Sequence, residues 1–108
     1  MRRRSTGDLM TSRSDGRKDD SGKPRATLVP WEAMRQAILA LEHGAAKYGV
    51  DNWRTVPNAR SRYMDAAHRH WEDLVDGPSL DDESGLSHAA HAVCCLLFVL
   101  WFDMNNTE

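Results

Sequence analysis

Apolar residues recur at helical spacings along this chain, and no segment alternates strictly between apolar and polar positions as a strand would. The first helical segment begins at Pro30, which suits the first turn of a helix, and its apolar residues lie three and four apart up to Leu41. We expect Gly44 to break or bend this helix. The pattern predicts an all-α fold.

Two further helices are predicted in the second half of the chain. One covers about residues 60–75 and is ended by Asp76-Gly77-Pro78, and the other covers about residues 84–103, with Ser84 or Ser87 as its N-cap. The short connection between them is expected to fold the second of these helices back antiparallel to the first. The apolar stripe of the helix at 60–75 includes Tyr63, Ala67, Trp71 and Leu74.

The last helix is apolar nearly all round from Ala89 onward, apart from His91, which is typical of a helix buried on several sides. A chain of 108 residues holds one domain with only a modest core. We therefore expect a second subunit to cover this helix, in a homodimer or a homotetramer. The predicted fold is a small helical bundle of about three main helices per chain, completed by oligomerisation.

Residues 1–22 are rich in Arg, Ser, Asp, Gly and Lys, and contain too few apolar side chains to order themselves. We interpret them as a tail, either a solvated leader or an arm that binds a partner, before a folded domain at 23–108. The whole chain has 14 Lys and Arg against 16 Asp and Glu, a formal net charge of -2. This balance makes nucleic acid an unlikely partner of the folded domain.

The chain is predicted to be a soluble protein of the cytoplasm. Its two cysteines, Cys94 and Cys95, are neighbours whose side chains diverge on a helix, so we expect small core residues and no disulfide. The most apolar run, 92–102, is shorter than the roughly 20 residues that a bilayer requires, and no apolar segment follows the basic residues 2–4. No membrane partner is expected.

The segment between the first two helices combines cationic, amide and aromatic side chains, a mixture that suits a nucleotide. The alternative is that Tyr48 and Trp53 pack against the first helix while the charged groups stay in water. Arg69, on the helix at 60–75, adds a further cation for phosphate. The candidate substrate-binding residues are Lys47, Asn52, Trp53, Arg54 and Arg69.

A cation site is predicted where the last two helices meet. Carboxylate oxygens are the ligands of Mg²⁺ and Mn²⁺, and such an ion would neutralise a polyphosphate and activate a water for attack on phosphorus. His88 and His91 lie three apart on one helix face, as metal ligands, as a base, or as ordinary histidines at the rim of a core. Zinc is disfavoured, because a hydrolytic zinc site needs three protein ligands and the His-Glu-x-x-His spacing is absent. The candidate metal ligands are Asp65, Glu72, Glu83, His88 and His91.

A series of short motifs gives the chain a wider resemblance. In order these are Gly22-Lys23-Pro24-Arg25, Leu28-Val29-Pro30, Gly44-Ala45-Ala46-Lys47-Tyr48-Gly49, Asn52-Trp53-Arg54, Arg69-His70, Asp81, Glu83-Ser84-Gly85 and His88-x-x-His91-Ala92. Over residues 16–102 the set resembles the bacteriophage dATP/dGTP diphosphohydrolase family, a branch of the MazG-like all-α NTP pyrophosphohydrolases. The resemblance implies dependence on Mg²⁺ or Mn²⁺ and cleavage of a purine dNTP between the α- and β-phosphates. The implied preference is for dGTP, with dATP as the other purine substrate.

The catalytic candidates are Glu72, Glu83 and His88, which are chosen from the residues of this chain and not carried over from the family's motifs. The metal motifs of the wider superfamily, Glu-x-x-Glu and Glu-x-x-Asp, are not intact: Glu42 is followed by Ala45, and His88-x-x-His91 stands where a carboxylate pair is expected. The alternative function is non-enzymatic, a small helical module that binds a partner or nucleic acid through its basic front and its apolar last helix.

Overall fold

The computed structural model describes residues 16–105, so residues 1–15 of the predicted tail lie outside the described part. Residues 16–22 form no helix. Three long helices follow, and within the described range no strand forms beyond one isolated bridge between Leu80 and Ser87. The prediction of an all-α fold with three main helices is confirmed. The elements in chain order are η2 (Ala26–Leu28), α1 (Trp31–Tyr48), η3 (Asn52–Thr55), α2 (Ala59–Asp76) and α3 (His88–Asn105).

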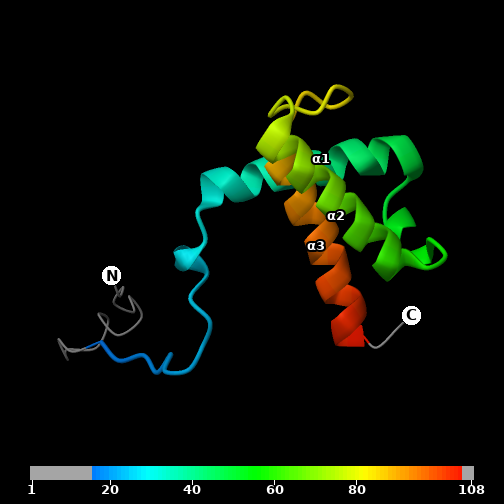
Figure 1. Cartoon of the computed structure of the whole chain (residues 1–108). Helices are drawn as coiled ribbons and strands as arrows, with labels where there is room; N and C mark the ends of the chain where they lie inside the picture. The colour runs from blue at the N-terminus through cyan, green and yellow to red at the C-terminus, as the bar shows by residue number, and fades with distance from the viewer. Residues whose placement is uncertain (1–15, 106–108) are drawn as a thin grey trace.

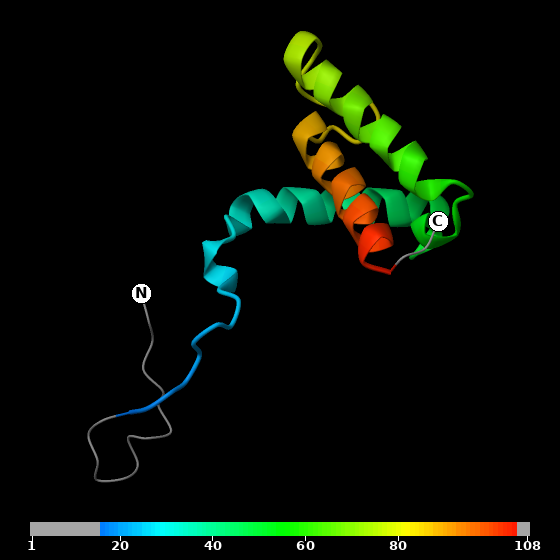
Figure 2. The same cartoon turned by 60° about the horizontal axis from the view of Figure 1, so that its bottom comes forward.

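The last helix holds the bundle together, because α3 packs against both α1 and α2. Figures 1 and 2 show α2 running antiparallel beside α3, while α1 crosses α3 steeply. The connection at residues 77–87 brings the end of α2 next to the start of α3 (Figure 1). The predicted antiparallel pair is thereby confirmed.

Two predicted helix boundaries are wrong. The first helix does not break at Gly44, because α1 continues to Tyr48 and ends at Gly49, whose φ of 103° is readily available only to glycine. The last helix begins at His88 and not at Ser84. Of the two candidate caps, Ser87 serves, since its Oγ accepts a hydrogen bond of 3.0 Å from the backbone N–H of Ala89.

Small side chains allow the helices to approach closely. Ala37 and Ala40 of α1 meet Ala90 and Cys94 of α3, and the Cys94 thiol donates a hydrogen bond of 3.1 Å to the Ala37 carbonyl. A second cluster forms where η3 reaches α3, with the Trp53 ring stacked on Phe98 at 4.4 Å between centroids. The second cluster anchors the segment between α1 and α2.

The apolar stripe predicted for α2 is only partly correct. Ala67 is buried, but Trp71 is 56% exposed and Leu74 is 40% exposed. The face of α2 that α3 covers contains Ala59 and Ala67, because alanines permit the short distance between these two helices. Trp71 and Leu74 are therefore left on the surface, while Tyr63 is partly buried and meets Phe98 at 4.9 Å between ring centroids.

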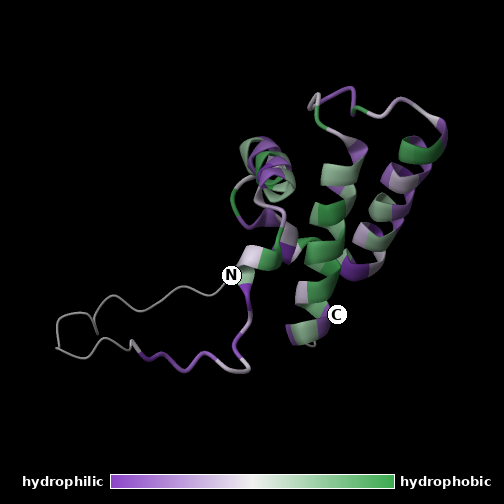
Figure 3. Ribbon diagram, turned by 90° about the vertical axis from the view of Figure 1, so that its left-hand side faces the viewer, coloured by the Kyte–Doolittle hydropathy of each residue, from purple (hydrophilic) through white to green (hydrophobic). Residues whose placement is uncertain are grey.

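One side of α3 stays uncovered within the described chain. The exposed residues recur at helical spacings opposite the buried face, and Figure 3 shows that α3 is apolar along most of its length. The helix is also long and apolar enough to cross a membrane, with a mean hydropathy of 1.3. The core helix of a soluble protein meets the same criterion, so length and composition alone do not make α3 a membrane span. The exposed stripe of α3 consists of Val93, Leu96, Leu97, Leu100 and Met104.

Candidate functional site

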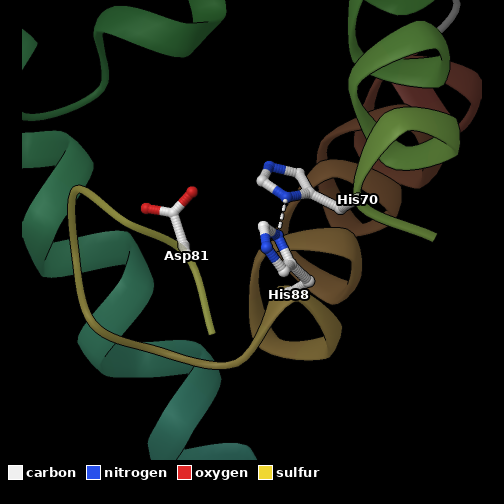
Figure 4. A group of neighbouring side chains, drawn as sticks. All are labelled: His70, Asp81 and His88. Carbon is white, nitrogen blue, oxygen red and sulfur yellow. Dashed lines mark hydrogen bonds between the residues drawn. The ribbon is translucent and has the colours of Figure 1, made fainter. Parts of the chain in front are cut away.

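Imidazole rings from two helices meet where α2 passes the start of α3. The Nδ1 atoms of His70 and His88 lie 2.9 Å apart, and the His70 ring stacks on the His91 ring at 5.0 Å between centroids. Asp81 faces them from the connecting loop (Figure 4). One ligand atom from each of His70, Asp81 and His88 lies within 4.8 Å of the others. These three residues, the His/Asp cluster, are arranged as a metal site would be.

The loop before α3 fixes the position of Asp81. Its Oδ2 accepts hydrogen bonds from the backbone N–H groups of Glu83, at 3.1 Å, and of Ser84, at 2.9 Å. The chain can turn back here because Gly85 has a φ of 75°. The Ser84 backbone N–H is the main cause that lowers the pKa of Asp81, so this carboxylate is ionised at neutral pH.

His70 and His91 are held in their neutral form at neutral pH. Burial is the main cause that lowers the pKa of both His70 and His91, and neighbouring imidazoles lower it further. A neutral imidazole is the form that binds a metal or accepts a proton. The Nε2 of His91 also lies 2.6 Å from Ser84 Oγ and 3.9 Å from Asp81 Oδ2.

A second polar group lies at the rim of the site. Glu83 Oε2 is 2.7 Å from Lys47 Nζ and 3.5 Å from His43 Nε2, so the connecting loop is tied to α1. The hydrogen bond with Lys47 is the main cause that lowers the pKa of Glu83, and the same bond raises the pKa of Lys47. Two residues predicted separately from the sequence are thus brought together.

A cavity of about 510 Å³ opens between α1, α2, α3 and η3. Its lining combines two kinds of surface, because Phe98 lies about two helical turns, or roughly 10 Å, beyond His91 along α3. Near the start of α3 the lining is polar, and farther along it is aromatic. The polar lining is His43, Lys47, His70, Asp81, Glu83 and His91, and the aromatic lining is Tyr48, Trp53, Tyr63 and Phe98.

A second cavity, of about 710 Å³, adjoins the first, and Tyr48, Asn52 and Tyr63 line both. Two predicted site residues, Asp65 and Arg69, line this second cavity and not the first. The structure therefore separates Asp65 from Glu83, although both were predicted as ligands of the same ion.

Besides His88, which is buried in the His/Asp cluster, two other predicted site residues line neither cavity. Glu72 is exposed on α2, with its Oε2 3.6 Å from His68 Nδ1. The guanidinium of Arg54 lies 4.6 Å from the ring centroids of both Trp53 and Trp101. The roles predicted for Glu72 and Arg54 remain predictions, without a described contact that brings either residue to the His/Asp cluster.

Trp53 lines the first cavity but also serves the fold. Its ring stacks on Phe98 and meets Trp101 edge-on, so it packs against α3 and not against α1 as the alternative proposed. Tyr48 is 62% exposed at the end of α1. Tyr48 thus offers a more open ring than Trp53.

Sequence reasoning did not assign three residues of the site, His43, His70 and Asp81. His70 could have been found, since it lies three residues after Ala67 on the face predicted to be apolar. A titratable side chain on a core-facing helix surface is a signal of this kind. His43 carries no comparable signal, because its contacts depend on how the loop folds over α1. Asp81 stands in the acidic run before the last helix and in the motif series, but it was not chosen as a ligand.

The two cysteines also line the first cavity, as buried free thiols. Burial raises the pKa of Cys94 to about 12 and that of Cys95 to about 11. Both thiols are protonated at neutral pH, so they are core residues and not nucleophiles.

Comparisons with known proteins give the chain its family. Residues 13–108 match the family described as dATP/dGTP diphosphohydrolase, N-terminal. A curated dATP/dGTP diphosphohydrolase of Salmonella phage PMBT28 is 37% identical over 91 residues, which cover 84% of this chain and 30% of that relative. No solved structure matches the chain. The resemblance read from the motifs is confirmed: this chain belongs to the dATP/dGTP diphosphohydrolase N-terminal family.

Proposed function

We propose that this chain is a metal-dependent pyrophosphohydrolase that cleaves a purine dNTP between its α- and β-phosphates, with dGTP preferred over dATP. The observation that carries the proposal is a single cavity lined by imidazoles and carboxylates on one part and by aromatic rings on another. Family membership supports it. Because the chain spans only 30% of the named relative, the activity of that relative is transferred as a proposal.

The substrate is proposed to lie along the first cavity. Its volume of about 510 Å³ falls within the roughly 300–1,000 Å³ usual for small-molecule sites. The triphosphate would lie near Lys47, and the purine would stack on Tyr48 and contact Trp53, while the Asn52 amide meets the edge of the base. This orientation places the negative charge of the substrate beside the one lysine of the lining.

The chain supplies groups for both charge and proton transfer. Lys47 would exchange Glu83 for a phosphate oxygen, which would free Glu83 to accept a proton from the attacking water. His91 is the second proposed base, because it is neutral and lines the cavity, and its Nε2 would exchange the Ser84 hydroxyl, now 2.6 Å away, for that water. A divalent ion, Mg²⁺ or Mn²⁺ by the resemblance, would neutralise the polyphosphate when bound. Beyond the first cavity, Arg69 is the proposed further cation.

We also propose that two or four copies complete a MazG-like bundle, and that the protein acts in the host cytoplasm. The exposed stripe of α3, defined above, supports the assembly, because an apolar helix face of this length is usually covered in a stable protein. Leu100 is 53% exposed near the middle of this face and would lie in the interface.

The test of function is a product analysis with the whole chain. Each dNTP is incubated with the purified protein and either Mg²⁺ or Mn²⁺, and the products are separated by anion exchange. The proposal expects the monophosphate and pyrophosphate, fastest from dGTP and next from dATP. Absence of both products with every dNTP would favour the non-enzymatic alternative, and release of triphosphate would indicate a different reaction.

A further inference from the structure

We propose that His70, His88 and Asp81 bind a divalent transition metal ion, such as Zn²⁺, Co²⁺ or Mn²⁺, in preference to Mg²⁺. The role of this ion in hydrolysis rests on the proposed function, but its binding does not. The three residues come from α2, α3 and the loop between them, so only the folded chain assembles the site.

The distances suit a metal of this class. Two nitrogens bound to one ion at about 2.1 Å, with an angle between tetrahedral and octahedral values, lie roughly 3.0 to 3.4 Å apart. The Nδ1 atoms of His70 and His88 are 2.9 Å apart, so an ion can replace their shared proton once both rings turn their lone pairs toward it. Asp81 completes the group within 4.8 Å and needs a shift on the order of 1 Å to bind the same ion.

The donor atoms of the three residues do not match the ligand preference of Mg²⁺. Mg²⁺ demands oxygen ligands in octahedral geometry, whereas two of the three donors are imidazole nitrogens. Imidazole suits zinc and other first-row transition metals, with an affinity that rises from Mn²⁺ through Co²⁺. Zinc was disfavoured from the sequence, where only His88 and His91 were weighed as its ligands. The structure instead joins His88 to His70 and Asp81, which makes three protein ligands.

The surroundings orient the ligands as in a built metal site. The outer nitrogen of His88, Nε2, lies 3.9 Å from Asp73 Oδ2, while its Nδ1 faces His70. A carboxylate that hydrogen-bonds to the outer nitrogen of a ligating histidine fixes the orientation of its ring and raises its basicity, and Asp73 would have to move closer to do so. The His88 side chain is 7% exposed and cannot turn freely into solvent. Backbone N–H groups hold Asp81 from the other side.

The plain alternative is a hydrogen-bonded pair of histidines at the edge of the core. Such a pair is held by one shared proton, and its hydrogen bond does not depend on the carboxylate of Asp81. A metal site needs all three side chains, so the Asp81→Asn variant separates the two interpretations. Asparagine keeps the size of the side chain and an oxygen acceptor for the backbone N–H groups, but loses the anionic ligand.

The test is calorimetric titration of the whole, metal-free protein without a histidine tag, using Zn²⁺, Co²⁺, Mn²⁺ and Mg²⁺ in turn. We expect one equivalent of Zn²⁺ or Co²⁺ to bind at least 100-fold more tightly than Mg²⁺. His70→Ala should weaken Zn²⁺ binding at least 100-fold, and Asp81→Asn at least 10-fold. The control is His68→Ala, which removes an exposed histidine two residues away on the same helix.

Equal affinities for Mg²⁺ and Zn²⁺, or unchanged Zn²⁺ binding by His70→Ala, would overturn the inference. If His70→Ala fails to fold by circular dichroism, the ring resonances of wild type decide: Co²⁺ should broaden those of His70 and His88 and leave that of His68 sharp, and the reverse result counts against the site. Tight Zn²⁺ binding without hydrolysis of any dNTP contradicts the proposed function alone. Hydrolysis with Mg²⁺, but without tight binding of a transition metal, contradicts this inference alone.

Discussion

His70 connects the parts of the candidate site at the scale of single residues. Its Nδ1 faces His88, its ring stacks on His91, and it lines the cavity that Lys47 and Glu83 border. Burial among other imidazoles keeps it neutral, which leaves a lone pair for a metal ion. Removal of this one ring would therefore disturb the metal site while most of the cavity lining stays in place.

The same burial makes the stability of the metal-free protein depend on pH. The folded-state pKa values of His70 and His91 are lowered, so below the ordinary value of 6.5 the unfolded chain binds more protons than the folded one. The stability that these two neutral imidazoles contribute should be complete at a pH well above 6.5. The free energy of unfolding should decrease as the pH falls below 6.5. Melting temperatures between pH 7.5 and 5.5, in the presence of a chelator, measure this.

The control for the pH series is His70→Ala, which should lose stability less steeply over the same range because one of the two lowered groups is gone. A wild-type melting temperature that stays constant or rises as the pH falls from 7.5 to 5.5 would show that the folded state does not hold these imidazoles neutral.

Lys47 is the residue whose removal should most directly weaken substrate binding. It is the cation at the polar part of the cavity, and Lys47→Met should lower kcat/KM for dGTP roughly 100-fold, mainly through KM. The melting temperature should fall only slightly, because the lost ion pair with Glu83 is exposed to solvent. Steady-state kinetics measure this, and Lys23→Met, at an exposed position before α1, is the matched control. Equal losses in the two variants would show that Lys47 acts only through overall charge.

At the scale of elements, the helices and their antiparallel pairing could be predicted, but the rotation of α2 could not. Apolar spacing located α1, α2 and α3, and the short connection at Asp76-Gly77-Pro78 set the direction of α3. The predicted apolar stripe contained both Ala67 and Trp71, but of these two only the small Ala67 is buried. With that rotation His70 turns inward, and Glu72 stays on the surface.

Two glycines, Gly44 inside α1 and Gly49 at its C-terminal end, give a matched test of where this helix ends. Gly44 lies inside the helix, and a Cβ there would meet nothing within 4 Å, so Gly44→Ala should stabilise the protein by about 0.5–1 kcal/mol. Gly49 has φ 103° and ψ 150°, a region that L-residues avoid, so Gly49→Ala should cost about 1–3 kcal/mol.

Urea unfolding of the two variants and the wild type measures both effects. A loss of stability in Gly44→Ala would mean that α1 bends at Gly44, as the sequence suggested.

At the scale of the whole molecule, the site was predicted where it is local and missed where it spans elements. Lys47, Glu83 and His91 carry their chemistry in their residue type, and the structure gathers them around one cavity. The partners His70 and Asp81 depend on how α2 and the loop before α3 meet, which no single periodicity encodes. Asp65 was predicted as a ligand from the pattern of charges along its helix alone. In the structure it lines the adjoining cavity, apart from Glu83.

The uncovered face of α3 predicts the assembly state. The wild-type chain should be a dimer or tetramer at micromolar concentration, and Leu100→Glu should dissociate it, because a charge cannot be buried in an apolar interface without a partner. Light scattering coupled to size exclusion gives the mass. The control is Leu28→Glu at another exposed leucine, in η2, and a monomeric wild type would contradict the assembly.

The measurement that tests the central claim most directly is the hydrolysis of dGTP by the wild type, His70→Ala and His68→Ala, with products identified and counted. The account predicts dGMP and pyrophosphate in equal amounts from wild type and His68→Ala, and a rate at least 100-fold lower from His70→Ala. Absence of dGMP from the wild type, or an undiminished rate from His70→Ala, would contradict it.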